Sequence, residues 1–218
     1  MTSGAEERRV MSTGLKVLYI DDEALLKMAF VETLKQQGYD ARGAISGKEA
    51  LELIDADIPD IIILDVMMKP MDGWETLSHI KNKEATRNVP IIMQTGKSLT
   101  IKDVIRYGDQ IEDYLIKPVR LPDLVKSVEG VRDRKEMISK EVDQATARGG
   151  DADLIAEYAQ VRHRTLIGKR LITILGRIYP IKTDGTIETD FDMPELHEII
   201  NRFEAESKRC QDLHKILF

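Results

Sequence analysis

The stretch from Ile61 to Trp74 constrains the fold more than any other part of the chain. Ile61–Leu64 is an unbroken run of bulky apolar residues, and it ends in a single carboxylate, Asp65. Such a run is typical of a strand that is buried on both faces of a parallel sheet. Because ligands bind beyond the carboxyl ends of parallel strands, we expect Asp65 to lie at a ligand-binding edge.

Segments with strand character alternate with segments of helical periodicity through residue 118. Strands are expected at residues 16–20, 39–44, 60–64, 91–94 and 111–116, and helices at 24–37, 47–56, 74–83 and 99–107. Ser46 is a plausible N-cap for the second helix. This alternation predicts an α/β fold with a doubly wound, five-stranded parallel sheet.

Polar side chains follow four of the five expected strands, and right-handed crossovers bring those strand ends to one edge. In chain order they are Asp21 and Asp22, Asp65, Thr95, and Lys117. Three carboxylates packed together repel one another, and a hard cation such as Mg²⁺ resolves that conflict. One carboxylate can then attack a phosphoryl group, while the lysine and the hydroxyl stabilise its charge. The pattern predicts an aspartate that accepts a phosphoryl group.

These motifs resemble the receiver domain of two-component response regulators. The resemblance covers roughly residues 15–130 and rests on Asp21-Asp22, Asp65, Thr95-Gly96 and Lys117-Pro118, each at the end of its strand. It implies a flavodoxin-like, CheY-like fold and phosphorylation by a sensor histidine kinase. A receiver of this kind catalyses only its own phosphotransfer and dephosphorylation, so the chain is not expected to be an enzyme in the usual sense.

The resemblance also implies a role for each site residue. Asp65 would be the phosphoacceptor. Asp21 and Asp22 would hold Mg²⁺ together with Asp65 and the backbone carbonyl of Met67. A magnesium ion is therefore the implied cofactor.

Two residues match the switch positions of the family. Thr95 would hydrogen-bond the phosphoryl group and Tyr114 would be the aromatic switch, while Lys117 would pair with the phosphoryl group. The Lys117-Pro118 peptide would be cis. A half-buried tyrosine of the sheet is the alternative interpretation of Tyr114.

The sequence departs from the family at one place, because Met68-Lys69-Pro70 puts the proline one position later than usual. A phosphatase of the haloacid dehalogenase type also uses an aspartate after a strand. That class expects a second acid two residues later, where this chain has Met67. The phosphatase interpretation therefore fits poorly.

Beyond the receiver-like part, the chain continues in long helices. We expect a disordered leader at residues 1–14, a receiver domain at 15–132 and an all-α helical extension at 133–218. The receiver's last helix is expected to overrun to Ala147, and Gly149-Gly150 and Asp151 to separate it from a helix that reaches about Tyr179. Pro180 and Asp184-Gly185 indicate a loop, and Pro194 begins a final helix.

Apolar residues recur in steps of three and four along these helices, as in seams that pack against a partner helix. The seam positions are Leu154, Tyr158, Val161, Thr165, Gly168, Ile172 and Leu175 in one helix, and Leu196, Ile199, Phe203, Cys210, Leu213 and Leu217 in the other. A helical hairpin or a dimer that completes a bundle would bury them.

Composition excludes several classes of protein. Cys210 is the only cysteine, so an internal disulfide is impossible and a reducing cytoplasm is expected. No apolar run reaches the roughly 18 residues of a membrane span. The net charge of −6 gives no general attraction to nucleic acid.

Three functions remain from these observations. The first is a phosphorylation switch whose helical extension signals by forming a homodimer or by docking on another protein. The second is a transcription regulator that binds DNA, since Arg162, His163, Arg164, Lys169, Arg170 and Arg177 make one helix basic. This alternative is not favoured, because no helix-turn-helix pattern accompanies the basic helix. The third is a hydrolytic phosphatase.

Overall fold

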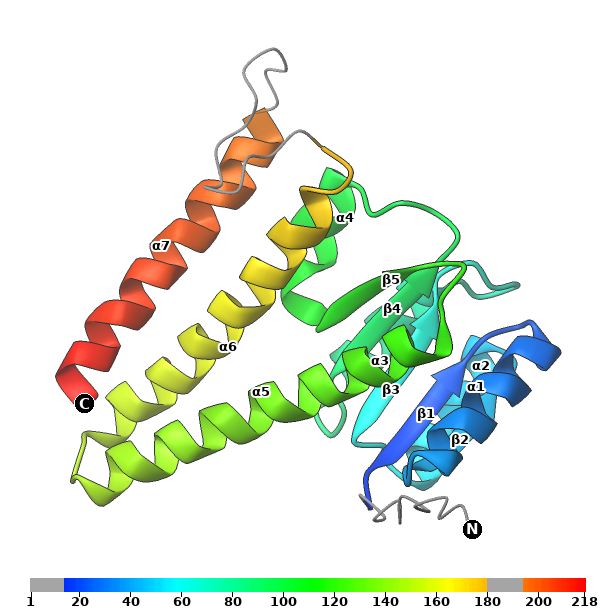
Figure 1. The fold of residues 1–218 in the computed structure, drawn as a ribbon, viewed down its shortest axis with the longest axis horizontal. Coiled ribbons are helices and arrows are strands. Elements are labelled where there is room, and N and C mark those ends of the chain that lie inside the picture. Colours follow the sequence, from blue (N-terminus) through cyan, green and yellow to red (C-terminus); the bar gives the residue numbers. More distant parts are fainter. Residues whose placement is uncertain (1–13, 180–193) are drawn as a thin grey trace, which may run out of the picture. The chain divides into compact units, whose positions relative to one another are not determined.

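A computed structural model describes residues 14–179 and 194–218 of the 218-residue chain (Figure 1). The expected leader, apart from Gly14, and the expected loop at Pro180 and Asp184-Gly185 lie outside the described residues. Among the helices of the described part, none combines the length and apolar composition that a membrane crossing requires.

The central feature is a five-stranded parallel sheet in the order β2-β1-β3-β4-β5. The strands are β1 (Lys16–Ile20), β2 (Asp40–Ala44), β3 (Ile61–Asp65), β4 (Ile91–Thr95) and β5 (Asp113–Ile116). Every residue of β3 is buried, as the aliphatic run predicted. The doubly wound α/β fold expected from the sequence is confirmed.

The strand register brings two of the acidic residues level with each other. In the parallel pairing of β1 with β3, Ile20 lies opposite Leu64. The next residues along the two strands are Asp21 and Asp65. The buried aliphatic faces fix the register of the two strands. The strand pairing therefore places both carboxylates at the same edge of the sheet.

Helices alternate with the strands and then extend beyond them. They are α1 (Ala24–Gln36), α2 (Gly47–Ala56), α3 (Gly73–Asn82), α4 (Ile101–Tyr107), the short 3-10 turn η1 (Gly108–Gln110), α5 (Leu121–Ala147), α6 (Ala152–Leu175) and α7 (Pro194–Leu217). Ser46 caps α2 by accepting the Glu49 N–H, and Asp151 caps α6, both as predicted. The Lys117–Pro118 peptide is cis, as the resemblance implied, and Lys69–Pro70 is also cis.

Several elements are shorter than the sequence indicated. Helix α4 begins at Ile101 instead of Leu99, and β2 begins at Asp40 instead of Tyr39. The fifth strand begins at Asp113 instead of Ile111. Helix α6 ends at Leu175 instead of near Tyr179, and Gly176 is its C-cap residue. Glycine is a poor helix former because its backbone loses more conformational freedom than that of any other residue, which explains the earlier end.

The chain forms two compact units. The first contains the residues up to Ile91 together with Arg120–Val125, and the second contains Ile92–Val119 together with Lys126–Phe218. In the second unit, α6 packs against β5 and η1, and α7 packs against α4 and α6 (Figure 1). The helical extension therefore shares one unit with elements of the sheet, and the domain boundary near residue 132 remains a prediction.

A small apolar core joins the three long helices at the end where α5 turns into α6. Its buried members are Ala145, Ile155, Tyr158, Val161, Cys210, Leu213 and Leu217. Most of the predicted seam positions of α6 and α7 are buried. The sequence did not indicate that Ile167, Leu171 and Ile174 of α6 would also be buried, so this helix is covered on more than one face.

Gly168 allows α6 and α7 to approach closely. A Cβ atom at this position would lie 2.2 Å from the Phe203 Cδ1 atom of α7, which is far inside van der Waals contact. Glycine costs a helix up to about 1 kcal/mol relative to alanine, so its presence here reflects packing rather than helix propensity.

We therefore expect Gly168→Ala to lower the free energy of unfolding by about 1–3 kcal/mol, because the added methyl group overpacks the helix pair. Gly130→Ala in α5 is the matched control, since a Cβ atom there would meet only the end of the Arg134 side chain, at 3.4 Å. The control should be neutral or stabilising by up to about 1 kcal/mol. Urea unfolding of both variants checks this, and equal stability of the two would contradict the packing role of Gly168.

Candidate functional site

The first unit holds a cluster of three carboxylates. One carboxylate oxygen from each of Asp21, Asp22 and Asp65 can be chosen so that all three lie within 4.8 Å of one another. Asp21 and Asp65 are buried and Asp22 is exposed. The structure therefore brings together the three acidic residues that the sequence singled out.

Asp21 is fixed by a hydrogen bond at each oxygen. Its Oδ1 atom accepts the Glu23 N–H at 3.0 Å, and its Oδ2 atom accepts the Tyr19 hydroxyl at 3.2 Å. Its own N–H donates to the Ala44 carbonyl oxygen of β2 at 3.1 Å. Both the backbone and the carboxylate of Asp21 are thus held before any ligand binds.

Asp65 ends β3 and is held by the turn that follows. Its Oδ1 atom accepts the Met67 N–H at 3.1 Å. The Gly73 N–H, at the start of α3, donates to the Val66 carbonyl oxygen at 3.0 Å. A Cβ atom at Gly73 would lie 2.2 Å from the Asp65 carbonyl oxygen, so only glycine allows α3 to begin this close to the acid.

The donor set fits a hard divalent cation. Carboxylate oxygens are the ligands that Mg²⁺ prefers, and an exposed member such as Asp22 leaves space for the waters that Mg²⁺ retains. Met67 is half exposed, two residues after Asp65. Its carbonyl oxygen remains a predicted ligand.

The second unit holds the other predicted residues, Thr95, Tyr114 and Lys117. Thr95 is the last residue of β4, and its Oγ1 atom accepts the Lys97 N–H at 3.2 Å. The Tyr114 hydroxyl donates to the Lys97 carbonyl oxygen, also at 3.2 Å. Lys97 therefore connects the two predicted switch residues through its backbone. Lys117 directly follows β5, and its N–H donates to the Thr95 carbonyl oxygen at 2.8 Å.

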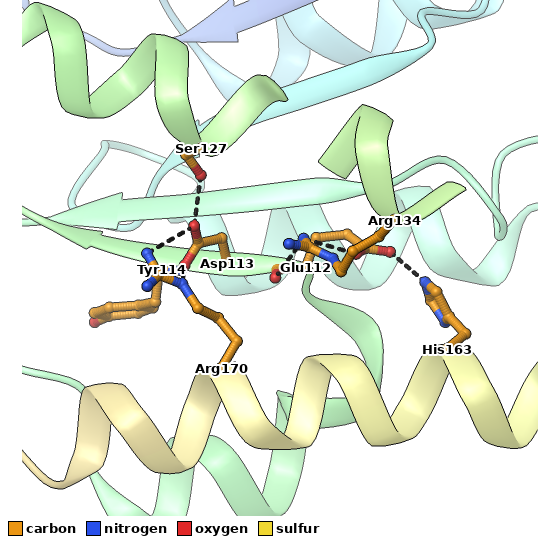
Figure 2. Close-up of polar contacts among 7 residues, drawn as sticks. All are labelled: Glu112, Asp113, Tyr114, Ser127, Arg134, His163 and Arg170. Atoms are coloured by element: carbon orange, nitrogen blue, oxygen red, sulfur yellow. Dashed lines mark hydrogen bonds and ion pairs between the residues drawn. The ribbon is translucent and has the colours of Figure 1, made fainter. Parts of the chain in front are cut away.

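The residue before Tyr114 connects β5 with two helices (Figure 2). The Asp113 carboxylate is buried and accepts two hydrogen bonds from Arg170 of α6, at 2.8 and 3.1 Å. It also accepts the Ser127 hydroxyl of α5 at 2.6 Å and the Tyr114 N–H at 2.8 Å. Through this one carboxylate, the backbone of the predicted switch residue is connected to α6.

Glu112 makes a second connection beside the first (Figure 2). Its carboxylate lies 2.6 Å from the Nε2 atom of His163 in α6 and 3.2 Å from an Nη2 atom of Arg134 in α5. Burial opposes the ionisation of Glu112, but the hydrogen bond with His163 and the charges of His163 and Arg134 hold the pKa of its carboxyl below the ordinary value. Two consecutive acids, Glu112 just before β5 and Asp113 at its start, are therefore contacted by basic side chains of both α5 and α6.

Glu112 and Asp113 were not predicted as functional residues from the sequence. The signal was two adjacent acids inside the segment that was expected to be the fifth strand. Buried carboxylates are paired or hydrogen-bonded, so a partner could have been anticipated. The sequence does not indicate which helix supplies that partner.

Comparison with known proteins identifies two regions. Residues 17–129 match the family model described as response regulator receiver domain. Residues 134–218 match the family model described as Metanogen output domain 2.

Solved structures that resemble this chain are receiver domains. The chemotaxis protein CheY4 of Vibrio cholerae is 29% identical, with a TM-score of 0.51, and the match covers 54% of this chain and 98% of that one. A putative response regulator from Chloroflexus aurantiacus is also 29% identical, with a TM-score of 0.50 and coverage of 54% and 97%. The N-terminal domain of a response regulator receiver protein from Methanoculleus marisnigri is 44% identical, with a TM-score of 0.47 and coverage of 54% and 95%.

Proposed function

The chain belongs to the response regulator receiver family, and on this premise we propose that Asp65 accepts a phosphoryl group from a sensor histidine kinase. The observation that carries the proposal is the carboxylate cluster, in which Asp65 lies beside Asp21 and Asp22 at the end of a fully buried strand. A buried acid in such a position has a functional rather than a packing role.

In the proposed reaction, an oxygen of the Asp65 carboxylate attacks the phosphorus of a phosphohistidine. The new P–O bond forms as the P–N bond breaks, and the imidazole leaves with the electron pair of the broken bond. A Mg²⁺ ion held by Asp21, Asp22, Asp65 and the Met67 carbonyl would supply charge neutralisation for the phosphoryl oxygens. The Met67 N–H holds the Asp65 carboxylate in place for this attack by donating to its Oδ1 atom.

Thr95 and Lys117 complete the proposal. The Thr95 hydroxyl would donate to a phosphoryl oxygen, and the Lys117 ammonium would pair with another. The chain would then be a cytoplasmic switch that performs only its own phosphotransfer and dephosphorylation.

We expect Asp65→Asn to abolish phosphate incorporation from acetyl phosphate, because an amide is not a nucleophile of this kind. Asp72→Asn is the matched control: Asp72 caps α3 by accepting the Glu75 N–H at 2.8 Å, and asparagine keeps that acceptor. The control should be labelled like the parent. Intact-mass spectrometry measures both, and undiminished labelling of Asp65→Asn would refute the assignment.

For the output, we propose that the helical extension carries the signal by forming a homodimer or by docking on another protein. Support comes from the position of Asp113, which is hydrogen-bonded to the N–H of Tyr114 and to Arg170 of α6. A change in the position of Tyr114 would alter the contact with α6 directly. Helix α5 is continuous from the receiver into the extension. The contact of Asp113 with α6 offers the signal a second path to the extension.

The basic residues of α6 support a protein interface rather than a DNA-binding surface. Of the six basic residues named from the sequence, Arg177 lies beyond the end of α6 at Leu175. Four of the other five lie in ion pairs, namely Arg162 with Glu141, His163 with Glu112, Arg164 with Glu206 and Arg170 with Asp113. Nucleic-acid binding requires cations that can reach phosphates, whereas these cations are engaged within their own unit.

Arg170→Met tests the link between β5 and α6, because methionine keeps an apolar side chain and removes the guanidinium. Asp113 is buried while Arg170 is 37% exposed in its side chain, so we expect a loss of about 1–2 kcal/mol in the free energy of unfolding. Coupling between sites is reciprocal, so the affinity of the full chain for beryllofluoride, a phosphoryl mimic, should also change.

The control is Arg209→Met, which removes an exposed ion pair with Glu157 between α7 and α6. It should leave both the free energy of unfolding and beryllofluoride binding nearly unchanged, because an exposed ion pair contributes little. Urea unfolding and a beryllofluoride titration of both variants provide the measurements. If Arg170→Met binds the mimic as the parent does, Asp113 does not couple the output helix to the phosphorylation site.

A further inference from the structure

Tyr19 lies directly behind the carboxylate cluster. It is fully buried in β1, and its ring stacks on Phe30 of α1 with 5.1 Å between the ring centroids. Successive side chains of a strand point to opposite faces, so Tyr19 and Asp21 share a face. The Tyr19 hydroxyl donates to the Oδ2 atom of Asp21 at 3.2 Å.

This hydrogen bond completes the fixation of Asp21. The Glu23 N–H already holds Oδ1, so the two donors together prevent rotation of the carboxylate about its Cβ–Cγ bond. With both oxygens held in this way, the carboxylate has one defined orientation in which to meet a cation.

The Tyr19 ring is itself held in place, which gives the hydroxyl a fixed position. Phe30 packs on one side, and β1 is paired with β2 and β3 on its two edges. A donor on a rigid, buried ring orients a ligand better than a donor on a mobile surface side chain. Such partners of metal ligands commonly change metal affinity by about 10–100-fold when they are removed.

We propose that Tyr19 is a positioning residue for the cation site, acting through Asp21. This inference rests on the proposed Mg²⁺ site and adds a residue to it. Tyr19 is not proposed as a ligand of the ion, and its effect is on the orientation of the Asp21 carboxylate.

The test is the dissociation constant of Mg²⁺ for the full chain, measured by calorimetric titration without any phosphodonor. Tyr19→Phe keeps the ring on Phe30 and removes only the hydroxyl, so we expect Mg²⁺ to bind about tenfold more weakly. Tyr39→Phe is the matched control. Tyr39 is a buried tyrosine of the same unit, and removing its hydroxyl leaves the hydroxyl of Tyr19 in place. The control should bind Mg²⁺ like the parent.

A double-mutant cycle tests whether Tyr19 acts through Asp21. In an Asp21→Ala background, Tyr19→Phe should change the dissociation constant by less than about twofold, because the carboxylate that accepts its hydrogen bond has been removed. An equal, full effect in both backgrounds would contradict the proposed route. A Tyr19→Phe variant that binds Mg²⁺ as tightly as the parent would refute the positioning role outright.

A second measurement uses the parent chain and does not depend on the folding of any variant. With ¹³C-labelled tyrosine, the Cζ resonance of Tyr19 should shift as Mg²⁺ binds, since the charge on its acceptor changes, whereas that of Tyr39 should not. Mg²⁺ binding with no shift at Tyr19 would overturn this inference and leave the cation site intact. If the parent binds no Mg²⁺ at all, the proposed cation site fails, and the role of Tyr19 fails with it.

Discussion

Three carboxylates repel one another in the first unit, and the arrangement of the residues around them offsets this repulsion. Asp21, Asp22 and Asp65 are close enough to share one ion, and two of them are buried. In such surroundings each negative charge raises the free energy of its neighbours, and burial adds to the cost. The fold offsets this cost with hydrogen bonds from Tyr19, Glu23 and Met67, and it leaves Asp22 in solvent. Such a cluster fits the divalent cation that we propose for this site.

The second unit meets a similar problem with a different solution. Glu112 and Asp113 place two buried carboxylates next to each other at the start of β5, and here the compensating basic side chains belong to the protein. Arg134 comes from α5, while His163 and Arg170 come from α6, so neutralising the acids also fixes the helices. Removing one partner of a buried pair is costly, which makes this contact specific for one arrangement of α6.

The fold and the acid cluster were predictable because their signals are local in sequence. The aliphatic run before Asp65 predicts a buried parallel strand, and the residues after each strand must lie at one edge of the sheet. The contact between Tyr19 and Asp21 is also local, since residues two apart in a strand share a face, but the pattern alone does not show whether a hydroxyl reaches a carboxylate.

The packing of the helical extension was less predictable. Its heptad-like seams describe how α6 and α7 meet, yet α6 also buries Ile167, Leu171 and Ile174. The ion pair of Asp113 with Arg170 joins residues 57 positions apart, and no periodic pattern connects them. Contacts of this kind depend on where a whole helix lies, which follows from the summed packing of many side chains rather than from any one motif.

The central claim is that the state of Asp65 reaches the output helices through β5 and α6. Amide hydrogen exchange of the full chain, with Mg²⁺ present and with or without beryllofluoride, measures this directly. We expect beryllofluoride to change amide hydrogen exchange at Asp113–Ile116 and along α6. The variant Thr95→Ala should still bind beryllofluoride but show a smaller change in exchange at these residues. If the mimic binds and exchange in β5 and α6 stays the same in the parent chain, the output helices do not receive the signal by this route.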